Sequence, residues 1–407
     1  MTSAELEPAS DAATPRSGHI AIVGGGLSGS LASVVLSRAG HRVTLIDRHT
    51  VYPKEFRVEK LAGQQISILR RLGLLDAITT SATPFRDTVN IRACRTIDRS
   101  DEQHYALRYE EIVRLVRAQL PPSVDFIVDR VASVTTGPKR QQVVLSDGRI
   151  ISADLLVLAT GMGDVLRLKL GMRRRIVAEK QSISFGFSIV PEAGSKFKCG
   201  SFTFYGGVSD RIDYLSLFPL GNVMRANLFT FLDHQDPWIR QLRRAPAATL
   251  HAVLPGLRAY LGDFAVVEGI ENWTMDLSVA ENVDQDGVVL IGDAFQTSCP
   301  AAGTGVTRLL TDIDRLCNVH VPRWLESPGM DRNKITQFYN DPVKTAVDAE
   351  AMRLAHYRRS LTVDRSLRWN LERRKHFTRR RVVGWIDQIS PGITAQLRSY
   401  RRKRTSA

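Results

Sequence analysis

Gly24-Gly25-Gly26-Leu27-Ser28-Gly29 follows the apolar run His19–Val23 and opens a stretch, Ser28–Ala39, whose composition favours a helix. Gly40 ends that stretch, and a second apolar run then leads to Asp47. The order is strand, glycine turn, helix, strand and acid within about 30 residues, which is the pattern of a dinucleotide-binding βαβ unit. The sequence therefore predicts a dinucleotide site at this turn. A structural turn without a ligand is the alternative.

Each glycine of the turn has its own task in such a unit. Gly24 allows the tight turn, Gly26 lets a pyrophosphate approach the backbone, and Gly29 lets the helix pack closely on the strand. The first helical residues, Leu27 and Ser28, offer free N–H groups and the positive end of the helix dipole to the phosphates.

The end of the second strand supplies the acidic residue of the pattern. Asp47 lies 18 residues after Gly29 and is placed to accept hydrogen bonds from a ribose diol. Arg48 follows it directly, and we count both residues as candidate cofactor contacts.

A second glycine motif stands far downstream. The buried-strand pattern Gly287–Ile291 runs into Gly292-Asp293-Ala294 and then into a small-residue stretch that contains Gly303 and Gly305. A helix follows, because apolar residues from Val306 onward recur at the spacing of one helical face. NAD alone would not need a second site so late in the chain.

The two motifs together resemble the para-hydroxybenzoate hydroxylase-like (class A) flavoprotein superfamily, whose second motif is usually GDAAH followed by Pro and GxG. The resemblance implies that the chain binds FAD. It implies that Asp293 binds the ribityl chain and that the backbone of Gly303 to Thr307, which includes Gly305 and Val306, faces the pyrimidine edge of the flavin. The alternative for Asp293 is a buried helix cap.

Three further segments match the same superfamily less specifically. Glu55–Glu59 resembles its DFRGD-type segment, which implies that Arg57 lies near FAD; a surface arginine is the alternative. Leu107–Ile112 matches the arginine before the next helix and makes Arg108 a cofactor candidate. Tyr214–Gly221 resembles the xxPLG strand of the substrate domain.

One segment departs from the superfamily pattern. The usual ADLxVGADG reads Ala153–Gly161 here, and Thr160 replaces the second acid. In the hydroxylases that acid helps with FAD and NAD(P)H. We therefore expect slow direct reduction by NAD(P)H.

Length and composition set the outer limits. With 407 residues, 43% of them apolar, the chain can bury a large core and suggests two domains. No apolar run is long enough for a transmembrane helix, and the polar start lacks the features of a secretory signal, so we expect a cytoplasmic protein. The four cysteines show no metal-ligand spacing, and no metal site is expected.

The patterns predict an α/β fold with a Rossmann-type FAD-binding domain, an inserted, mainly antiparallel β-sheet domain for the substrate, and a helical C-terminal region. We assign residues 18–180 and 276–350 to the FAD-binding domain and 181–275 to the substrate domain. Residues 1–17 are expected to be a disordered tail, and 351–407 a basic helical region.

The C-terminal region carries nearly all of the net charge. Residues 351–407 hold sixteen Lys or Arg and three acids, a net charge of +13 against +14 for the whole chain. Apolar and aromatic residues are interleaved with these cations. Such a region suits an anionic membrane surface or an acidic protein, or it covers the folded core; nucleic acid is not favoured, since no recognition motif occurs.

The resemblance implies a monooxygenase that uses FAD, O2 and NAD(P)H to hydroxylate or epoxidise an aromatic or lipophilic organic substrate. The alternative is an FAD-dependent reductase of the geranylgeranyl reductase type, which Thr160 would suit. A third hypothesis is a basic adaptor that keeps flavin without catalysis. No catalytic residue is assigned from the sequence.

Overall fold

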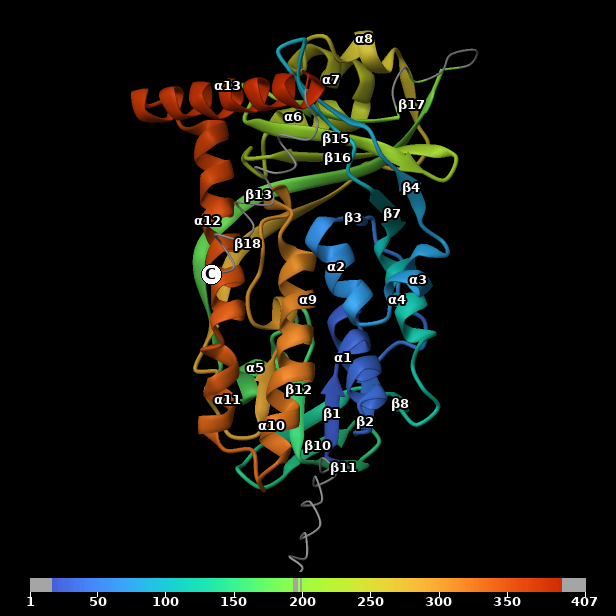
Figure 1. Cartoon of the computed structure of the whole chain (residues 1–407), viewed down its shortest axis with the longest axis vertical. Coiled ribbons are helices and arrows are strands. Elements are labelled where there is room, and N and C mark those ends of the chain that lie inside the picture. Colours follow the sequence, from blue (N-terminus) through green and yellow to red (C-terminus); the bar gives the residue numbers. More distant parts are fainter. Residues whose placement is uncertain (1–16, 193–196, 198–199, 390–407) are drawn as a thin grey trace, which may run out of the picture.

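The computed structural model describes residues 17–192, 197 and 200–389, and its lower half in Figure 1 is built on a parallel sheet. This five-stranded sheet has the order β19-β12-β1-β2-β8. Its central strands are apolar on both faces, as expected for a parallel sheet that is covered on both sides. The strands are β1 (His19–Val23), β2 (Arg42–Asp47), β8 (Asp125–Val128), β12 (Leu155–Leu158) and β19 (Val288–Leu290).

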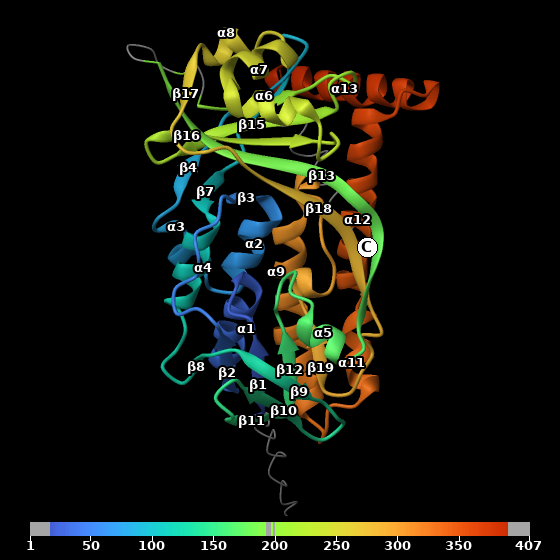
Figure 2. The ribbon, with the colours of Figure 1, turned by 180° about the vertical axis from the view of Figure 1, so that it is seen from behind.

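Helices cover one face of the parallel sheet and a small sheet lies behind it. Helices α1 (Leu27–Arg38) and α9 (Gly305–Arg315) contact each other in front of the strands in Figure 1. Seen from behind in Figure 2, the opposite side carries α5 (Val165–Lys169) and an antiparallel sheet. That sheet consists of β9 (Val131–Thr135), β10 (Gln141–Leu145) and β11 (Ile150–Ala153).

A second three-stranded sheet joins the two halves of the molecule. It has the order β3-β7-β4 and is antiparallel. Its strands are β3 (Val58–Ala62), β4 (Thr83–Phe85) and β7 (His104–Arg108), and the adjoining helices are α2 (Gly63–Arg71), α3 (Leu75–Thr79) and α4 (Tyr109–Arg117).

An eight-stranded sheet lies across the upper half of the molecule (Figures 1 and 2). Every pairing in it is antiparallel except that of β14 with β5. The strands are β5 (Thr88–Arg92), β6 (Arg95–Ser100), β13 (Arg173–Pro191), β14 (Ser201–Tyr205), β15 (Ile212–Leu220), β16 (Val223–Thr230), β17 (Phe264–Val266) and β18 (Glu271–Glu281).

The two faces of this sheet differ in chemistry because successive side chains along a strand point in opposite directions. The upper face is apolar and packs under α6 (Pro237–Arg244), α7 (Pro246–Val253) and α8 (Leu257–Leu261). The lower face, which looks toward the parallel sheet, carries hydroxyl, amide and aromatic side chains. In register across β15, β16 and β13 it presents Tyr214, Phe229 and Ser184, then Ser216, Asn227 and Gly186, then Phe218, Arg225 and Ser188.

Helices form the C-terminal part of the described chain. Asp341 caps α12 (Pro342–Val363) by accepting hydrogen bonds from the amides of Val343 and Lys344, and Pro342 takes the first helical position. Helix α13 (Leu367–Ile389) follows and lies crosswise over the end of α12, with one end extending beyond the body (Figure 1). The shorter α10 (Val321–Leu325) and α11 (Arg332–Tyr339) precede α12.

The α/β fold and the helical C-terminal region are confirmed. The predicted sheet segment 181–275 lies within the eight-stranded sheet, but that sheet also takes in β5 and β6 and both ends of the long pair β13 and β18. The boundaries at 181 and 275 therefore cut through paired strands, because backbone pairing continues past the point where the sequence pattern changes. The tail 1–17, apart from Ser17, and residues 390–407 lie outside the described residues.

Candidate cofactor and substrate site

The glycine turn after β1 has the tight geometry expected of it. Gly24 has φ +104° and donates its N–H to Ile46 O at 2.9 Å. A Cβ on Gly29 would overlap Gly24 O, so this glycine allows α1 to approach the turn. A Cβ on Gly26 would meet no atom closer than Tyr52 at 3.8 Å. The protein leaves room beside Gly26 and none beside Gly29.

Asp47 lies against this turn. Its Oδ2 accepts a hydrogen bond from the Gly25 amide at 2.6 Å, and its Oδ1 accepts one from the His49 amide at 2.8 Å. The next residue, Arg48, forms no hydrogen bond or ion pair with any described residue. The predicted acid is thus at the turn, held by two backbone N–H groups.

Arg117 also holds the turn, and sequence reasoning missed it. From the last position of α4 its guanidinium donates to Gly25 O at 2.9 and 2.7 Å and to His49 O and Thr50 O at 2.9 Å each. Its side chain is 9% exposed and lies 3.6 Å from the Asp47 carboxylate. An arginine at a helix end is common, so only the tertiary contacts reveal this role.

The second glycine motif meets the first in space. Gly292 has φ +60°, and a Cβ placed on it would lie 2.5 Å from the Ser28 hydroxyl oxygen. Its N–H donates to Asp312 Oδ2 of α9 at 2.8 Å. The turn after β19 and the N-terminus of α1 are therefore neighbours.

Several polar groups around this second turn have no protein partner. The Asp293 carboxylate is half-buried and accepts no hydrogen bond from the described residues. Thr304, the N-cap residue of α9, makes no capping hydrogen bond, and its Oγ1 is buried without a partner in the described chain. The start of α9 at Gly305 and Val306 therefore offers free backbone N–H groups beside Gly303, where an added Cβ would meet nothing within 4 Å.

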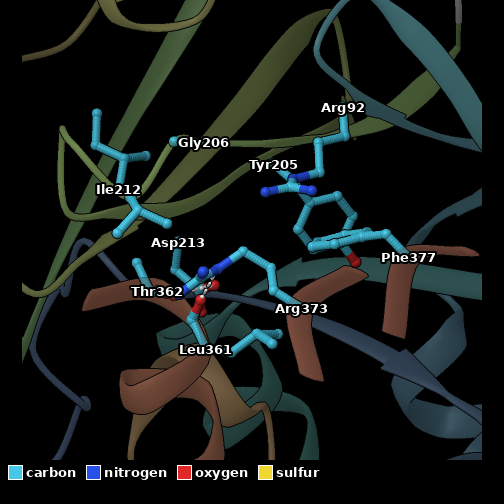
Figure 3. A pocket seen from close by; sticks show the side chains of 11 residues that line it. Arg92, Tyr205, Gly206, Ile212, Asp213, Leu361, Thr362, Arg373 and Phe377 are labelled. Carbon is cyan, nitrogen blue, oxygen red and sulfur yellow. Dashed lines mark hydrogen bonds between the residues drawn. The ribbon is translucent and has the colours of Figure 1, made fainter. Parts of the chain in front are cut away.

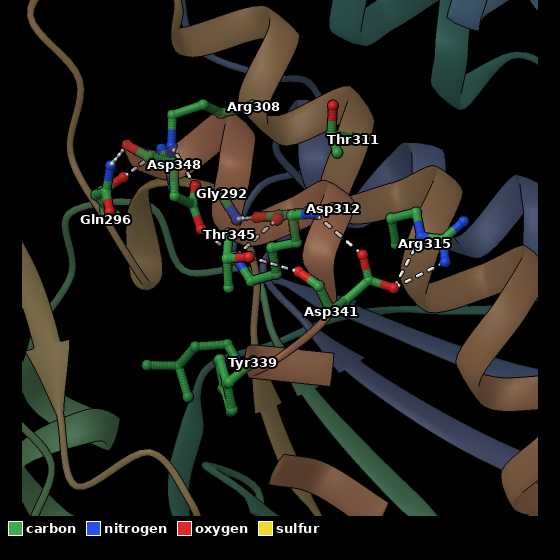
Figure 4. Close-up of polar contacts among 12 residues, drawn as sticks. Gly292, Gln296, Arg308, Thr311, Asp312, Arg315, Tyr339, Asp341, Thr345 and Asp348 are labelled. Atoms are coloured by element: carbon green, nitrogen blue, oxygen red, sulfur yellow. Dashed lines mark hydrogen bonds and ion pairs between the residues drawn. The ribbon is translucent and has the colours of Figure 1, made fainter. Parts of the chain in front are cut away.

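A buried network of charged side chains from α9 and α12 packs against the turn after β19 (Figure 4). Lys344 Nζ lies 2.9 Å from Asp312 Oδ1 and 2.8 Å from Asp348 Oδ2. Arg308 Nε lies 2.7 Å from Asp348 Oδ1, and its Nη1 donates to Gln296 O at 2.7 Å. Lys344 and Asp312 are each 1% exposed. Helices α9 and α12 thus hold the loop after Asp293 in place through paired charges. No sequence motif predicted this network.

Arg57 lies in the same region with its charge already paired. Its guanidinium donates to Glu55 and lies over the Tyr109 ring, 3.9 Å from the centroid. Burial raises the pKa of Glu59 on β3, opposed by Arg57 and reinforced by the Asp293 charge. The predicted residues Arg57 and Asp293 therefore share one electrostatic environment.

The segment with Thr160 contacts the second turn through an arginine. Arg174 at the start of β13 donates to Gly161 O at 3.1 Å and to Asp293 O at 2.8 Å, and its Nε donates to Asp164 at 3.2 Å. The Thr160 hydroxyl donates to Gly163 O at 3.2 Å. Arg174 is a second residue that sequence reasoning missed.

Arg108 is directed toward the eight-stranded sheet. Its Nη2 pairs with Glu268 Oε1 at 2.7 Å, in the connection between β17 and β18. Burial and the nearby Arg108 charge lower the pKa of Arg225 to about 10. Arg108 thus lies where the β7 end meets the sheet, and a contact with the cofactor remains a prediction.

The lower face of the sheet touches the loop that starts α9. Tyr214 Oη donates to Ala301 O at 3.0 Å. Phe231, directly after β16, and Leu277 of β18 pack with Cys299 and Ala301 of the loop. This contact brings the polar face of the sheet to the same loop whose other end offers free N–H groups.

Comparison with known proteins identifies the fold. A family model described as an FAD binding domain matches residues 18–318. The chain belongs to this FAD binding domain family. It binds FAD and is an FAD-dependent oxidoreductase of the class A monooxygenase type.

Among curated proteins, 3-amino-4-hydroxybenzoate 2-monooxygenase PtnB3 of Streptomyces platensis is 25% identical over 72% of this chain and 77% of its own. Two solved structures share the fold. The p-nitrophenol 4-monooxygenase PnpA of Pseudomonas putida DLL-E4 has a TM-score of 0.72 at 16% identity, covering 94% of this chain and 97% of its own. A variant of Klebsiella pneumoniae HpxO complexed with FAD has a TM-score of 0.68 at 18% identity, covering 91% and 98%.

The residues at the two turns fit FAD. The room beside Gly26, the free N–H groups of α1 and α9, the orphaned Thr304 hydroxyl and the unpartnered Asp293 carboxylate are the donors and acceptors that a dinucleotide with a polyol chain needs. Among the residues that the structure describes, no group of three His, Cys, Asp or Glu is arranged to hold a metal ion.

Proposed function

We propose that this protein hydroxylates a small polar aromatic molecule with O2, with NAD(P)H as the source of electrons. The observation that carries the proposal is the polar lower face of the eight-stranded sheet, joined to the α9 loop by the bond from Tyr214 to Ala301. FAD supplies the electron-transfer and oxygen chemistry of the family, and the protein binds, orients and excludes water.

The turns and helix starts define how the cofactor would be held. The α1 start and Gly26 would receive the pyrophosphate, Asp47 the ribose and Asp293 the ribityl chain. Free N–H groups at Gly305 and Val306 would stabilise negative charge at the pyrimidine edge. This assignment is supported by the tight turn at Gly24 and Gly29, the room beside Gly26, the position of Asp47 and the unpartnered groups at Asp293 and the start of α9. Arg48, Arg57 and Arg108 are weaker candidates.

The lower face of the sheet would hold the substrate. Ser184, Ser216 and Asn227 offer hydrogen-bonding groups, and the half-buried Phe229 offers an aromatic wall. Phe218 lies on the same face but is buried against the Phe85 ring. Burial raises the pKa of Tyr214, so its hydroxyl stays protonated and donates to Ala301 O, which keeps the loop against the sheet.

The charge on this face narrows the substrate class. Arg225 is 1% exposed and donates to Asn227 Oδ1 at 3.0 Å and to Phe56 O. With a pKa of about 10 it remains protonated at neutral pH. A buried cation on a face of hydroxyl and amide groups favours an aromatic substrate with a phenolic or carboxylate group. One curated relative is named for its action on such a compound.

The test is turnover with defined compounds. Purified FAD-loaded protein is incubated with NADH or NADPH, isotopically labelled O2 and a panel of hydroxybenzoates, aminohydroxybenzoates, nitrophenols and isoprenoid alkenes. We expect one labelled oxygen atom in the product. Incorporation only into an alkene would indicate an epoxidase, while reduction of an alkene without oxygen uptake would indicate the reductase alternative.

The reduction of FAD by NAD(P)H is tested separately. Thr160 in place of an acid predicts slow reduction by NADPH alone and faster reduction with substrate or a separate reductase. Rapid stopped-flow reduction without substrate would contradict this expectation, and no reduction by any donor would favour the non-catalytic adaptor.

A further inference from the structure

Helix α13 is fixed on the sheet by its inner face (Figure 3). Phe377 is buried against the Tyr205 ring, with ring centroids 5.4 Å apart. Arg380 donates to both Asp98 carboxylate oxygens at 2.7 and 3.0 Å and to the Tyr205 hydroxyl at 2.6 Å. A Cβ on Gly384 would lie 2.7 Å from Asp98 Cβ. These contacts settle which face of α13 points outward.

The outward face carries a stripe of large apolar side chains. Leu367, Leu371, Val382 and Trp385 are 82%, 65%, 50% and 64% exposed. At about 100° per residue, the four fall within about 60° of one another around the helix axis. Such a stripe on a helix that is already anchored elsewhere marks an interaction surface.

Cations flank the stripe on both sides. Arg374 and Arg381 lie along one edge, and Arg368, Lys375 and Arg379 lie along the other, all exposed. None of the five forms an ion pair with a described residue. Their charges are therefore available to a partner.

We propose that α13 binds the surface of an anionic lipid membrane, with the apolar stripe at the acyl boundary and the flanking cations among the headgroups. An apolar face edged by Lys and Arg is the pattern of an interfacial helix. The location is peripheral, since no helix in the described chain has the length and apolarity needed to cross a membrane.

Other occupants fit the surface less well. An acidic protein would pair with the cations but would leave the central stripe at Leu367, Leu371 and Val382 exposed to water, unless it also carried a matching apolar patch. A second copy packed through the same face would bring like charges together across a two-fold axis. An anionic membrane satisfies the stripe and the cations at once.

The test is sedimentation of the full-length FAD-loaded protein with vesicles. We expect it to pellet with phosphatidylcholine vesicles that contain one part in three of phosphatidylglycerol at low salt, and to stay in the supernatant at high salt or with phosphatidylcholine alone. Because each cation near an anionic surface contributes about 1 kcal/mol, the double variant Arg374→Glu, Lys375→Glu should bind at least about tenfold more weakly.

Matched variants distinguish binding through the apolar stripe of α13 from binding through any exposed charge or apolar side chain. Leu371→Gln with Trp385→Gln should reduce binding to anionic vesicles at least about tenfold, whereas Trp273→Gln, at a 47% exposed tryptophan of β18, and Arg240→Glu on α6 should leave it within about twofold. FAD content and the far-ultraviolet spectrum report folding.

Three outcomes would overturn the proposal. The first is no pelleting at low salt. The second is unchanged binding in the Leu371→Gln, Trp385→Gln variant, which would place the affinity in residues 390–407 instead. The third is capture by polyglutamate, or self-association in sedimentation velocity lost in that variant, without vesicle binding; these would indicate an acidic protein or a second copy.

Discussion

Ser28 and Gly292, which belong to two separate glycine motifs, are in direct contact: a Cβ on Gly292 would lie 2.5 Å from the Ser28 hydroxyl oxygen. Neither motif forms a cofactor site alone. The first brings a helix start and an acid, and the second brings a carboxylate and another helix start. We propose that the fold assembles the FAD site at their junction.

The first prediction tests this junction. Gly292→Ala should reduce FAD affinity at least about tenfold, because both its φ of +60° and the Ser28 contact oppose a side chain. Gly221→Ala is the matched control, since Gly221 has φ +58° and nothing within 4 Å, so it should cost only the strain of about 1–2 kcal/mol. Fluorescence titration with FAD measures the FAD affinity of Gly292→Ala, and urea unfolding measures the cost of the strain in Gly221→Ala. Adding Ser28→Ala should partly restore binding; equal FAD affinity in all variants would contradict the junction.

The second prediction distinguishes a glycine that leaves room for the ligand, Gly26, from a glycine that is needed for packing, Gly29. Gly26→Val should leave the FAD-free protein folded, because its Cβ meets nothing closer than 3.8 Å, yet it should abolish FAD binding by blocking the pyrophosphate. Gly29→Val should instead impair folding itself, since its Cβ would overlap Gly24 O. Circular dichroism and flavin content distinguish the two, and normal flavin in Gly26→Val would refute the assignment.

Asp293 provides the third prediction. Because its carboxylate has no partner in the described chain, Asp293→Ala should weaken FAD binding by about 1–3 kcal/mol without lowering the stability of the FAD-free protein. Asp314→Ala on α9, which removes an exposed pairing with Arg71, is the control and should bind FAD normally. An unchanged FAD dissociation constant in Asp293→Ala would contradict its role.

The buried network behind the turn gives the fourth prediction. Lys344→Met leaves the buried Asp312 without its cation and leaves Asp348 paired with Arg308 alone, and it should cost about 3–5 kcal/mol of unfolding free energy. FAD affinity should fall with it, because Asp312 holds the Gly292 amide. Arg353→Met on the same helix removes an exposed pair with Glu350 and should cost at most about 1 kcal/mol. Equal costs in urea unfolding would show that the network is not structural.

The fifth prediction concerns acid stability at Asp341. Burial by itself raises the pKa of Asp341, but hydrogen bonds from Arg315, the Lys344 amide and His320 outweigh burial and lower it to about 2. A folded pKa below the ordinary value of 3.8 means that the stabilisation is complete above about pH 4 and is lost as the pH falls toward 2. The loss should amount to about 2 kcal/mol. Asp341→Asn should flatten this part of the stability profile; an equally steep profile would contradict the coupling.

Local sequence patterns predicted much of the candidate FAD-binding region. The βαβ unit, the Gly24–Gly29 turn, Asp47 and the turn at Asp293 were all readable because backbone geometry at a glycine turn demands particular residues at particular spacings. The basic, helical C-terminal region was readable from composition for the same local reason. The structure shows where the residues of these motifs lie, and the cofactor roles of all of them, together with those of Arg48, Arg57 and Arg108, remain predictions.

Only the tertiary structure decided the rest. Arg117 holds the first turn from the end of α4, and Lys344 reaches Asp312 from a helix that follows the motif; such contacts depend on how elements pack, which no spacing in the chain encodes. The same holds for the sheet, where Tyr214 meets Ala301 and β5 joins β14. The backbone conformation of a tight turn restricts which residues can stand there, so the sequence reveals it locally. Contacts between residues far apart in the chain form only when the chain has buried its core.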